Sequence, residues 1–117
     1  MYSTDLLVWG ITIHLVIDWV FQNDWMARNK DKPSHSAAWV HSALHGWGMS
    51  LIFPWSVALG IGLLHLLIDM RKPLIWWGRV YHQTNDPQNP VTLHVTIWRD
   101  QVVHIVVIAL AAILCGR

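Results

Sequence analysis

The chain alternates long apolar segments with shorter polar ones. The apolar stretches cover residues 2–21, 37–70 and 91–114, and the polar connections cover residues 22–36 and 71–90. A helix that crosses a bilayer needs about 20 apolar residues. The first and last stretches are therefore each long enough to form one membrane-spanning helix.

The middle stretch decides the predicted architecture. As a single helix it would be ~51 Å long at ~1.5 Å per residue, well beyond a hydrocarbon core of ~30 Å. Its apolar pattern is interrupted at residues 50–55, and Pro54 suits the first turn of a new helix. We therefore predict a helical hairpin there. The predicted fold is all-α: one domain of residues 1–117, an integral membrane four-helix bundle with up-down topology and helices at about 2–21, 37–52, 54–70 and 91–115.

The polar connections carry most of the basic residues. Six of the eight Lys and Arg residues fall there: Arg28, Lys30, Lys32, Arg71, Lys72 and Arg79. By the positive-inside tendency this side is cytoplasmic, and both termini lie on the opposite side. Residues 73–82, with Trp76, Trp77 and Tyr81, predict a short interfacial segment between the third and fourth helices.

The composition agrees with a membrane protein. Of the 117 residues, 54% are apolar and 13% charged, nine are Trp and none is Glu, which argues against a charge-covered, water-soluble surface. The first residues lack a basic region and a cleavage site, so we expect no removed signal peptide. The net charge of +1 gives no sign of a nucleic-acid partner. We expect membrane lipids as partners, with a homo-oligomer or a larger membrane complex as open alternatives.

The metal-capable side chains follow a repeated spacing. Four pairs stand four residues apart in the apolar segments: His14/Asp18, His41/His45, His65/Asp69 and Asp100/His104. A spacing of four places both members on one face of a helix. Helices in up-down order would bring all four pairs to a similar depth, near the basic side. Ionisable residues inside a membrane are costly, so this set is a functional-site hypothesis.

Five imidazoles and three carboxylates predict a metal site. Such ligands suit zinc, iron or manganese, and the His-rich, thiolate-free set favours these metals over calcium and magnesium. Eight ligands exceed the needs of one tetrahedral ion. We therefore expect one or two divalent transition-metal ions, zinc first and iron or manganese as alternatives. A purely structural network of His–Asp hydrogen bonds stays open as the other interpretation.

The chemistry of such a site favours hydrolysis. A metal ion activates a bound water and polarises an ester or phosphoryl oxygen, and Asp18, Asp69 or Asp100 could serve as general base. We predict a metal-dependent hydrolase at the cytoplasmic membrane face that acts on a lipid or lipid-linked substrate. The alternatives are an accessory subunit with a structural metal or haem, and an ion or proton transport component.

The remaining polar candidates have simpler interpretations. His35 and His82 are expected to be solvated loop residues, and His94 an interfacial or packing residue. Gln22 and Asp24 lie beside the first pair, where they would support the cluster or cap a helix.

The ordered motifs also resemble a known family. Residues 14–30 read HLVIDWVFQNDWMARNK, similar to the opening of the small bacterial and phage membrane proteins grouped as domain-of-unknown-function family 3307. His41, the His65/Asp69 pair and the Asp100/His104 pair fit the same pattern, over essentially the whole chain. The Trp enrichment and the compact hairpin depart from it. The resemblance implies an integral protein of the bacterial inner membrane, or a phage protein inserted there, without implying an activity. A looser similarity is to predicted membrane-bound metal-dependent hydrolases.

Overall fold

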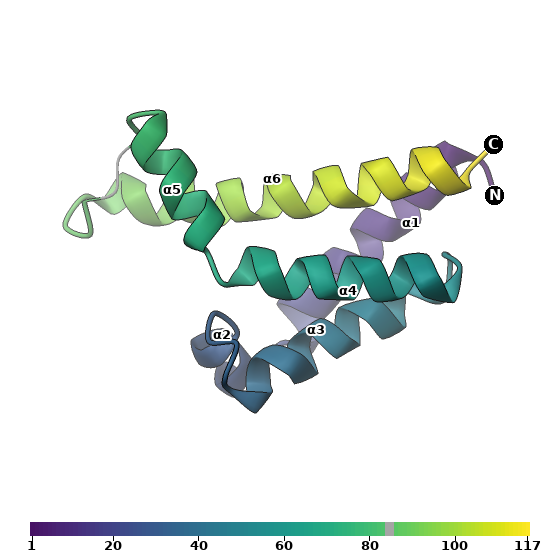
Figure 1. Ribbon diagram of the computed structural model, residues 1–117, viewed down its shortest axis with the longest axis horizontal. Helices are drawn as coiled ribbons and strands as arrows, with labels where there is room; N and C mark the ends of the chain where they lie inside the picture. The colour runs from purple at the N-terminus through teal and green to yellow at the C-terminus, as the bar shows by residue number, and fades with distance from the viewer. Residues whose placement is uncertain (84–85) are drawn as a thin grey trace.

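Helices make up all the regular structure of the described residues. The computed structural model describes residues 1–83 and 86–117. Four long helices form its body (Figure 1): α1 (Ser3–Val16), α3 (Ser36–Met49), α4 (Trp55–Asp69) and α6 (Pro90–Cys115). Two shorter helices, α2 (Asp24–Asn29) and α5 (Lys72–Val80), lie in the polar connections. The all-α fold class is therefore confirmed.

The sequence predicts one helix over residues 2–21, but the first apolar segment does not form a uniform α-helix. After Val16 it continues as one π-helical turn, η1 (Ile17–Phe21), before the chain becomes extended at Gln22. Single π turns are rare and are frequent at functional sites. Asp18 lies in this turn, so the helical irregularity coincides with one of the candidate ligands.

The middle segment forms the predicted hairpin. α3 ends at Met49, three residues earlier than expected, and a turn follows in which the Phe53 N–H donates to the Met49 carbonyl at 2.9 Å. Pro54 then occupies the N-cap position of α4. Proline costs little there, because the backbone N–H groups at a helix start have no intrahelical partner.

Two glycines allow α3 and α4 to approach closely. A Cβ atom added at Gly62 would lie 3.2 Å from the Ser42 carbonyl oxygen and 3.3 Å from the Gly46 Cα. Both neighbours are backbone atoms, so neither can rotate away as a side chain would. The absence of side chains at Gly46 and Gly62 therefore sets the separation of the two helices.

Each long helix packs against two others. α3 contacts α4, α1 contacts α3 and α6, and α4 also contacts α6. The two chain ends meet, with the Ser3 N–H 3.4 Å from the Arg117 carbonyl oxygen. Figure 1 shows both termini at one end of the molecule, and α2 and α5 at the other. α2 and α5, with the residues next to them, carry the six basic residues of the connections.

The apolar core lies in the half of the molecule nearer the hairpin turn and the termini. It is built from α1, α3, the turn, α4 and α6, and its buried residues are Leu6, Met49, Phe53, Ala58, Ile61, Ile108, Ala111 and Ala112. The same four helices carry the candidate ligands in their other half. Each helix therefore contributes an apolar section and a polar section to the interior.

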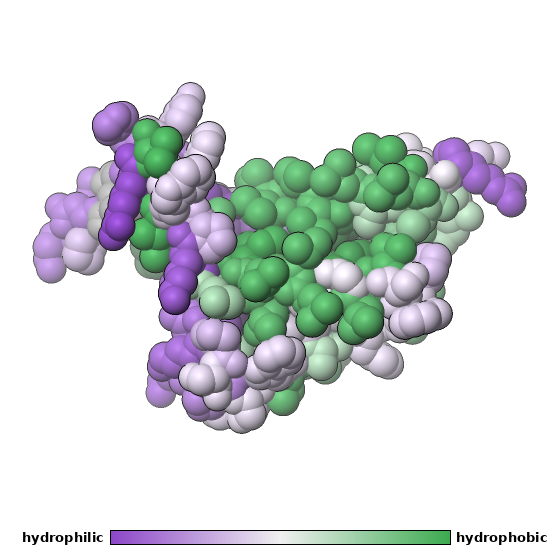
Figure 2. Space-filling view, viewed as in Figure 1, coloured by the Kyte–Doolittle hydropathy of each residue, from purple (hydrophilic) through white to green (hydrophobic). Residues whose placement is uncertain are grey.

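The outside of the long helices is also apolar. Figure 2 shows a broad hydrophobic band between the polar end with α2 and α5 and a smaller polar patch at the termini. All nine Trp side chains are exposed. Two helical stretches, Ser3–Phe21 and Pro90–Cys115, are long and apolar enough to cross a membrane by length and composition, and α4 is a shorter apolar helix.

The first polar connection is more ordered than we had expected. Asn23 caps α2 by accepting a hydrogen bond from the Met26 N–H at 2.9 Å, so neither Gln22 nor Asp24 is the cap. The prediction that His35 is a solvated loop residue is wrong. Its Nδ1 accepts from the Ala37 N–H at 3.0 Å and caps α3, since α2 folds the connection back toward that helix.

We expect substitution of Gly62 to show how tightly α3 and α4 pack. Gly62→Ala should lower the free energy of unfolding by about 1–3 kcal/mol, because overpacking against backbone cannot be relieved by a rotamer change. Gly60→Ala is the matched control in the same helix, since nothing lies within 4 Å of its added Cβ. Unfolding in detergent micelles, followed by circular dichroism, measures both. Equal stability of the two variants would contradict the packing argument.

Candidate metal centre

The four pairs meet inside the molecule. All eight residues are buried, and none has more than 7% of its whole-residue surface exposed: His14, Asp18, His41, His45, His65, Asp69, Asp100 and His104. They come from α1 and η1, α3, α4 and α6. Residues 90 positions apart in the sequence therefore share one polar cluster.

Asp18 is the centre of one half of the cluster. Its Oδ1 lies 2.9 Å from the His45 Nε2 and 3.1 Å from the His41 Nε2. Its Oδ2 lies 3.3 Å from the Nε2 of His14, one turn earlier on the same helix. Three imidazoles from two helical segments thus surround one carboxylate.

Asp69 is the centre of the other half. Its Oδ2 lies 2.9 Å from the His65 Nε2 and 3.4 Å from the His41 Nε2, and its Oδ1 lies 3.2 Å from the His104 Nε2. His41 therefore contacts both carboxylates. The cluster consists of two sets, each with three imidazoles and one carboxylate, that share His41.

These separations match the spacing of ligands around a metal ion. A tetrahedral zinc with bonds of ~2.0–2.1 Å places neighbouring ligand atoms about 3.4 Å apart. The Nε2–carboxylate distances of the two sets run from 2.9 to 3.4 Å. The Nε2 atoms of His41 and His65 and the Oδ2 of Asp69 are buried, and among the described residues none of these atoms has hydrogen-bond geometry to a partner. Polar atoms this close but not hydrogen-bonded are suited to sharing an ion.

Three groups of side chains could hold a metal ion by the distances between their ligand atoms. Within each group these atoms lie within 4.8 Å of one another. The groups are Asp18 with His41, His45 and His65; His14 with His65 and His104; and Asp69 with Asp100 and His104. Together the three groups contain all eight residues of the four pairs predicted from the sequence.

The imidazole rings pack directly on one another. The ring centroids of His45 and His65 are 3.6 Å apart and those of His65 and His104 are 4.1 Å apart, both in stacked geometry. Two cationic rings at such a distance would repel strongly in a buried site. The stacking therefore favours neutral imidazoles, which is the form that binds metals.

Gln101 also belongs to the cluster, although the spacing of the His and Asp residues does not predict this. Its Oε1 accepts a hydrogen bond from the His14 Nε2 at 2.9 Å, and its Nε2 donates to the Asp18 Oδ2 at 3.1 Å. The side chain is buried and bridges α6 to α1. Its position three residues before His104 places it on the cluster face of the helix, a signal that a search limited to ionisable side chains overlooks.

Asp100 differs from the other two carboxylates. It contacts a single imidazole, with the His104 Nε2 3.6 Å from its Oδ1, and that oxygen has no hydrogen-bond partner among the described residues. It also lines two clefts, of about 200 and 350 Å³. Asp100 is thus the carboxylate of the cluster that is both under-coordinated and reachable from a cleft.

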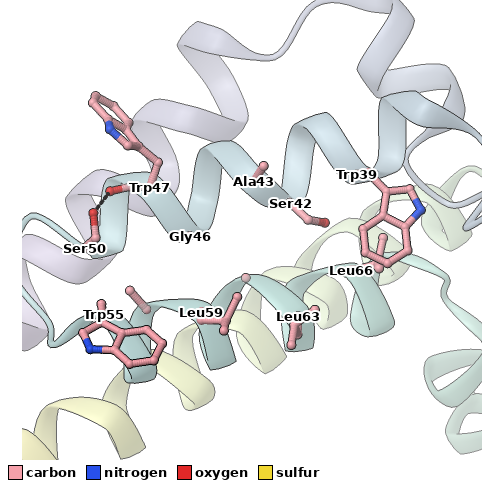
Figure 3. Close-up of a pocket in the computed structure, with 12 residues that line it drawn as sticks. Trp39, Ser42, Ala43, Gly46, Trp47, Ser50, Trp55, Leu59, Leu63 and Leu66 are labelled. Carbon is pink, nitrogen blue, oxygen red and sulfur yellow. Dashed lines mark hydrogen bonds between the residues drawn. The ribbon is translucent and has the colours of Figure 1, made fainter.

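A larger groove on the outside of α3 and α4 carries no such chemistry. Figure 3 shows it running from Trp39 at one end to Trp47 and Trp55 at the other, and its volume is about 460 Å³. Its lining contains no ionisable side chain, and the Ser50 hydroxyl donates to the Trp47 carbonyl at 2.6 Å. The groove is an apolar surface feature, separate in its lining from the His/Asp cluster.

The comparison with protein families agrees with the resemblance noted from the motifs. A family model described as a protein of unknown function, DUF3307, matches residues 6–116. The chain belongs to the DUF3307 family. The match covers all the residues of the cluster in this DUF3307 protein, from His14 to His104. No curated protein and no solved structure matches the chain.

We expect loss of the Asp18 carboxylate to destabilise this DUF3307 protein. Asp18→Ala leaves the buried His45 imidazole and the Gln101 amide without their hydrogen-bond acceptor, and removing one partner from a buried ionic cluster costs about 3 kcal/mol or more. Asp5→Ala is the control, because Asp5 is an exposed residue at the start of the same helix. Urea unfolding in detergent micelles, monitored by Trp fluorescence, compares the two. An Asp18→Ala variant as stable as the control would contradict a structural role for the carboxylate.

Proposed function

We propose that this DUF3307 protein is a membrane-embedded metalloprotein that hydrolyses a lipid or lipid-linked substrate at the cytoplasmic face of the membrane. The observation that carries the proposal is the pair of three-imidazole, one-carboxylate sets around Asp18 and Asp69. Burying so many polar groups in an apolar protein is costly in free energy. A bound metal ion would offset this cost and would supply the chemistry of the proposed hydrolysis.

The outer surface supports placement in a membrane. The exposed apolar residues of the long helices and the exposed Trp side chains fit a hydrocarbon band with aromatic belts. In the arrangement we propose, the four long helices form an up-down bundle, with the end that bears α2 and α5 in the cytoplasm. α5 lies along the headgroups, with Leu74 and Gly78 buried and Trp76 and Trp77 exposed.

The ligand chemistry supports a transition metal. Imidazole nitrogens with carboxylate oxygens and no thiolate suit zinc, with iron or manganese as alternatives. The two carboxylate centres provide for one or two ions. Gln101 would orient Asp18, because its amide donates to the Asp18 Oδ2, as hydrogen-bonded neighbours commonly orient metal ligands.

Asp100 is the best general base for the proposed reaction. The metal ion would polarise the ester or phosphoryl oxygen of the substrate. Asp100 would take a proton from a water whose oxygen bonds to the reacting centre. The bond to the leaving alcohol then breaks, and the proton passes from Asp100 to the alkoxide. Asp100 lines both clefts and its Oδ1 has no hydrogen-bond partner among the described residues, whereas Asp18 lines one of these clefts and Asp69 neither, which favours Asp100 as the base.

A metal-free polar network is the second candidate function, because some contacts are complete without an ion. The Nε2 atoms of His45 and His104 make hydrogen bonds to the Asp18 and Asp69 carboxylates. In that case the cluster would only lock the helices of an accessory subunit together. Transport through the monomer is less well supported, since the apolar core around Met49 and Ile108 fills the other half of the interior.

Metal content separates the two candidates. Protein purified without chelator should contain about one or two equivalents of a divalent transition metal by elemental analysis, as the two sets would accommodate. His41→Ala should lower that content, because His41 contacts both carboxylates. His94→Ala, an exposed histidine on α6, should leave it unchanged. Metal-free protein, or equal content in the two variants, would leave the hydrogen-bonded network as the function of the cluster.

Hydrolysis tests the role of Asp100. In micelles, metal-loaded protein should hydrolyse p-nitrophenyl phosphate or a p-nitrophenyl ester. Asp100→Asn should slow this reaction by about 100-fold, within the usual contribution of a general base, while the metal content stays the same. Asp31→Asn, in the first connection, is the control. Full activity of a metal-replete Asp100→Asn variant would exclude the residue as the base.

A further inference from the structure

A cleft of about 200 Å³ connects the cluster with the basic end of the molecule. Asp18, Asp100 and Gln101 of the cluster line it together with two cationic residues, Lys30 and Arg71. Lys30 follows α2, and Arg71 stands between α4 and α5, only two residues after Asp69. The cleft thus brings positive side chains from both polar connections to the edge of the metal-capable cluster.

The backbone at Arg71 is in a demanding conformation. Its φ is 63°, in the left-handed region that glycine adopts freely and that side-chain-bearing residues seldom enter. Arg71 occupies the N-cap position of α5 without a side-chain capping bond. Strained positions of this kind are common at ligand-binding sites, and here the strained residue contributes its guanidinium to the cleft.

The cations of the cleft form no close ion pair with a carboxylate of the described residues. In the described part of the chain every ion pair joins an imidazole to an aspartate, so Lys30 and Arg71 have no carboxylate within ion-pair distance. The Oε1 of Gln22, which lines the same cleft, is buried without a hydrogen-bond partner. The cleft therefore keeps charged and polar groups available for a ligand.

A neighbouring cleft of about 350 Å³ extends the basic surface. It shares Arg71, Thr96 and Asp100 with the first cleft and adds Arg79 and Arg99. The Arg99 Nη1 donates to the Gln83 Oε1 at 2.7 Å, which fixes that side chain, whereas Arg79 is exposed on α5. The joined clefts offer a cationic path from the surface to Asp100.

We propose that this cleft, defined by Lys30 and Arg71, binds the phosphate group of a phosphoester substrate beside the metal centre. The inference rests on the proposed function, because Asp18 and Asp100 would repel an anion unless a metal cation offsets their charge. With the metal bound, guanidinium and ammonium groups hold the phosphate oxygens by charge-assisted hydrogen bonds. The phosphate of a lipid headgroup and free inorganic phosphate present the same chemistry to these groups.

The test measures phosphate binding to protein purified in detergent micelles and loaded with zinc. Inorganic phosphate and short-chain dihexanoyl phosphatidic acid are the two probes, titrated by calorimetry. Arg71→Gln and Lys30→Gln should each raise the Kd about tenfold, the loss expected for one charge-assisted hydrogen bond. Lys72→Gln and Lys32→Gln are the matched controls, since each lies within two residues of its partner but outside the cleft lining, and both should stay within about twofold.

The outcomes separate this inference from the proposed function, because metal content is measured on the same samples. Zinc-loaded wild type that binds neither probe, or four variants with equal Kd values, would overturn the phosphate site while leaving the metal centre intact. Phosphate binding with the expected variant pattern in a protein that takes up no metal would remove the hydrolase and contradict the argument that a metal cation must offset the charge of Asp18 and Asp100. Phosphatidic acid binding at least tenfold tighter than inorganic phosphate assigns the site to a lipid headgroup, and equal affinities assign it to free phosphate.

Discussion

The burial of two carboxylates among imidazoles is the constraint on which this structure depends. Asp18 and Asp69 are each contacted by three histidines, and His41 joins the two sets. A carboxylate that left this arrangement would remain buried without its partners, at a cost of several kcal/mol. The relative positions of α1, α3, α4 and α6 are therefore tied to the cluster, because each helix supplies at least one member of it.

The apolar half of the interior and the glycines of the hairpin let the helices meet this constraint. The absence of side chains at Gly46 and Gly62 brings α3 close to α4, which places His41 and His45 against His65. Met49 and Ile108 then fill the space beyond the cluster. Packing in one half of the molecule and polar contacts in the other thus depend on the same helix separations.

Much of this arrangement could be predicted from local patterns in the sequence. The hydrophobic segments and Pro54 predicted the hairpin, and the spacing of four predicted that each pair shares a face. The π turn at Asp18 could not be predicted, because it reflects how the end of α1 meets the other helices rather than a local propensity. The role of Gln101 was missed because its contacts join α6 to α1 and are set by tertiary packing. The cap at His35 is a local contact with Ala37, and it was missed because histidine is not among the common N-cap residues.

The cluster lies between an apolar end and a basic end of the molecule, so its two sides differ. The hairpin turn and the termini lie at one end of the molecule, and α2 and α5 lie at the other (Figure 1). The apolar core is built near the first end, whereas the clefts are lined by basic residues beside α2 and α5. A charged molecule would therefore meet Arg71 and Lys30 before it reached Asp100. Attraction between these cations and an anionic group operates at the surface, while the imidazole–carboxylate sets are buried among the helices. The fold separates the two environments by placing one at the helix ends and the other a turn or two inside.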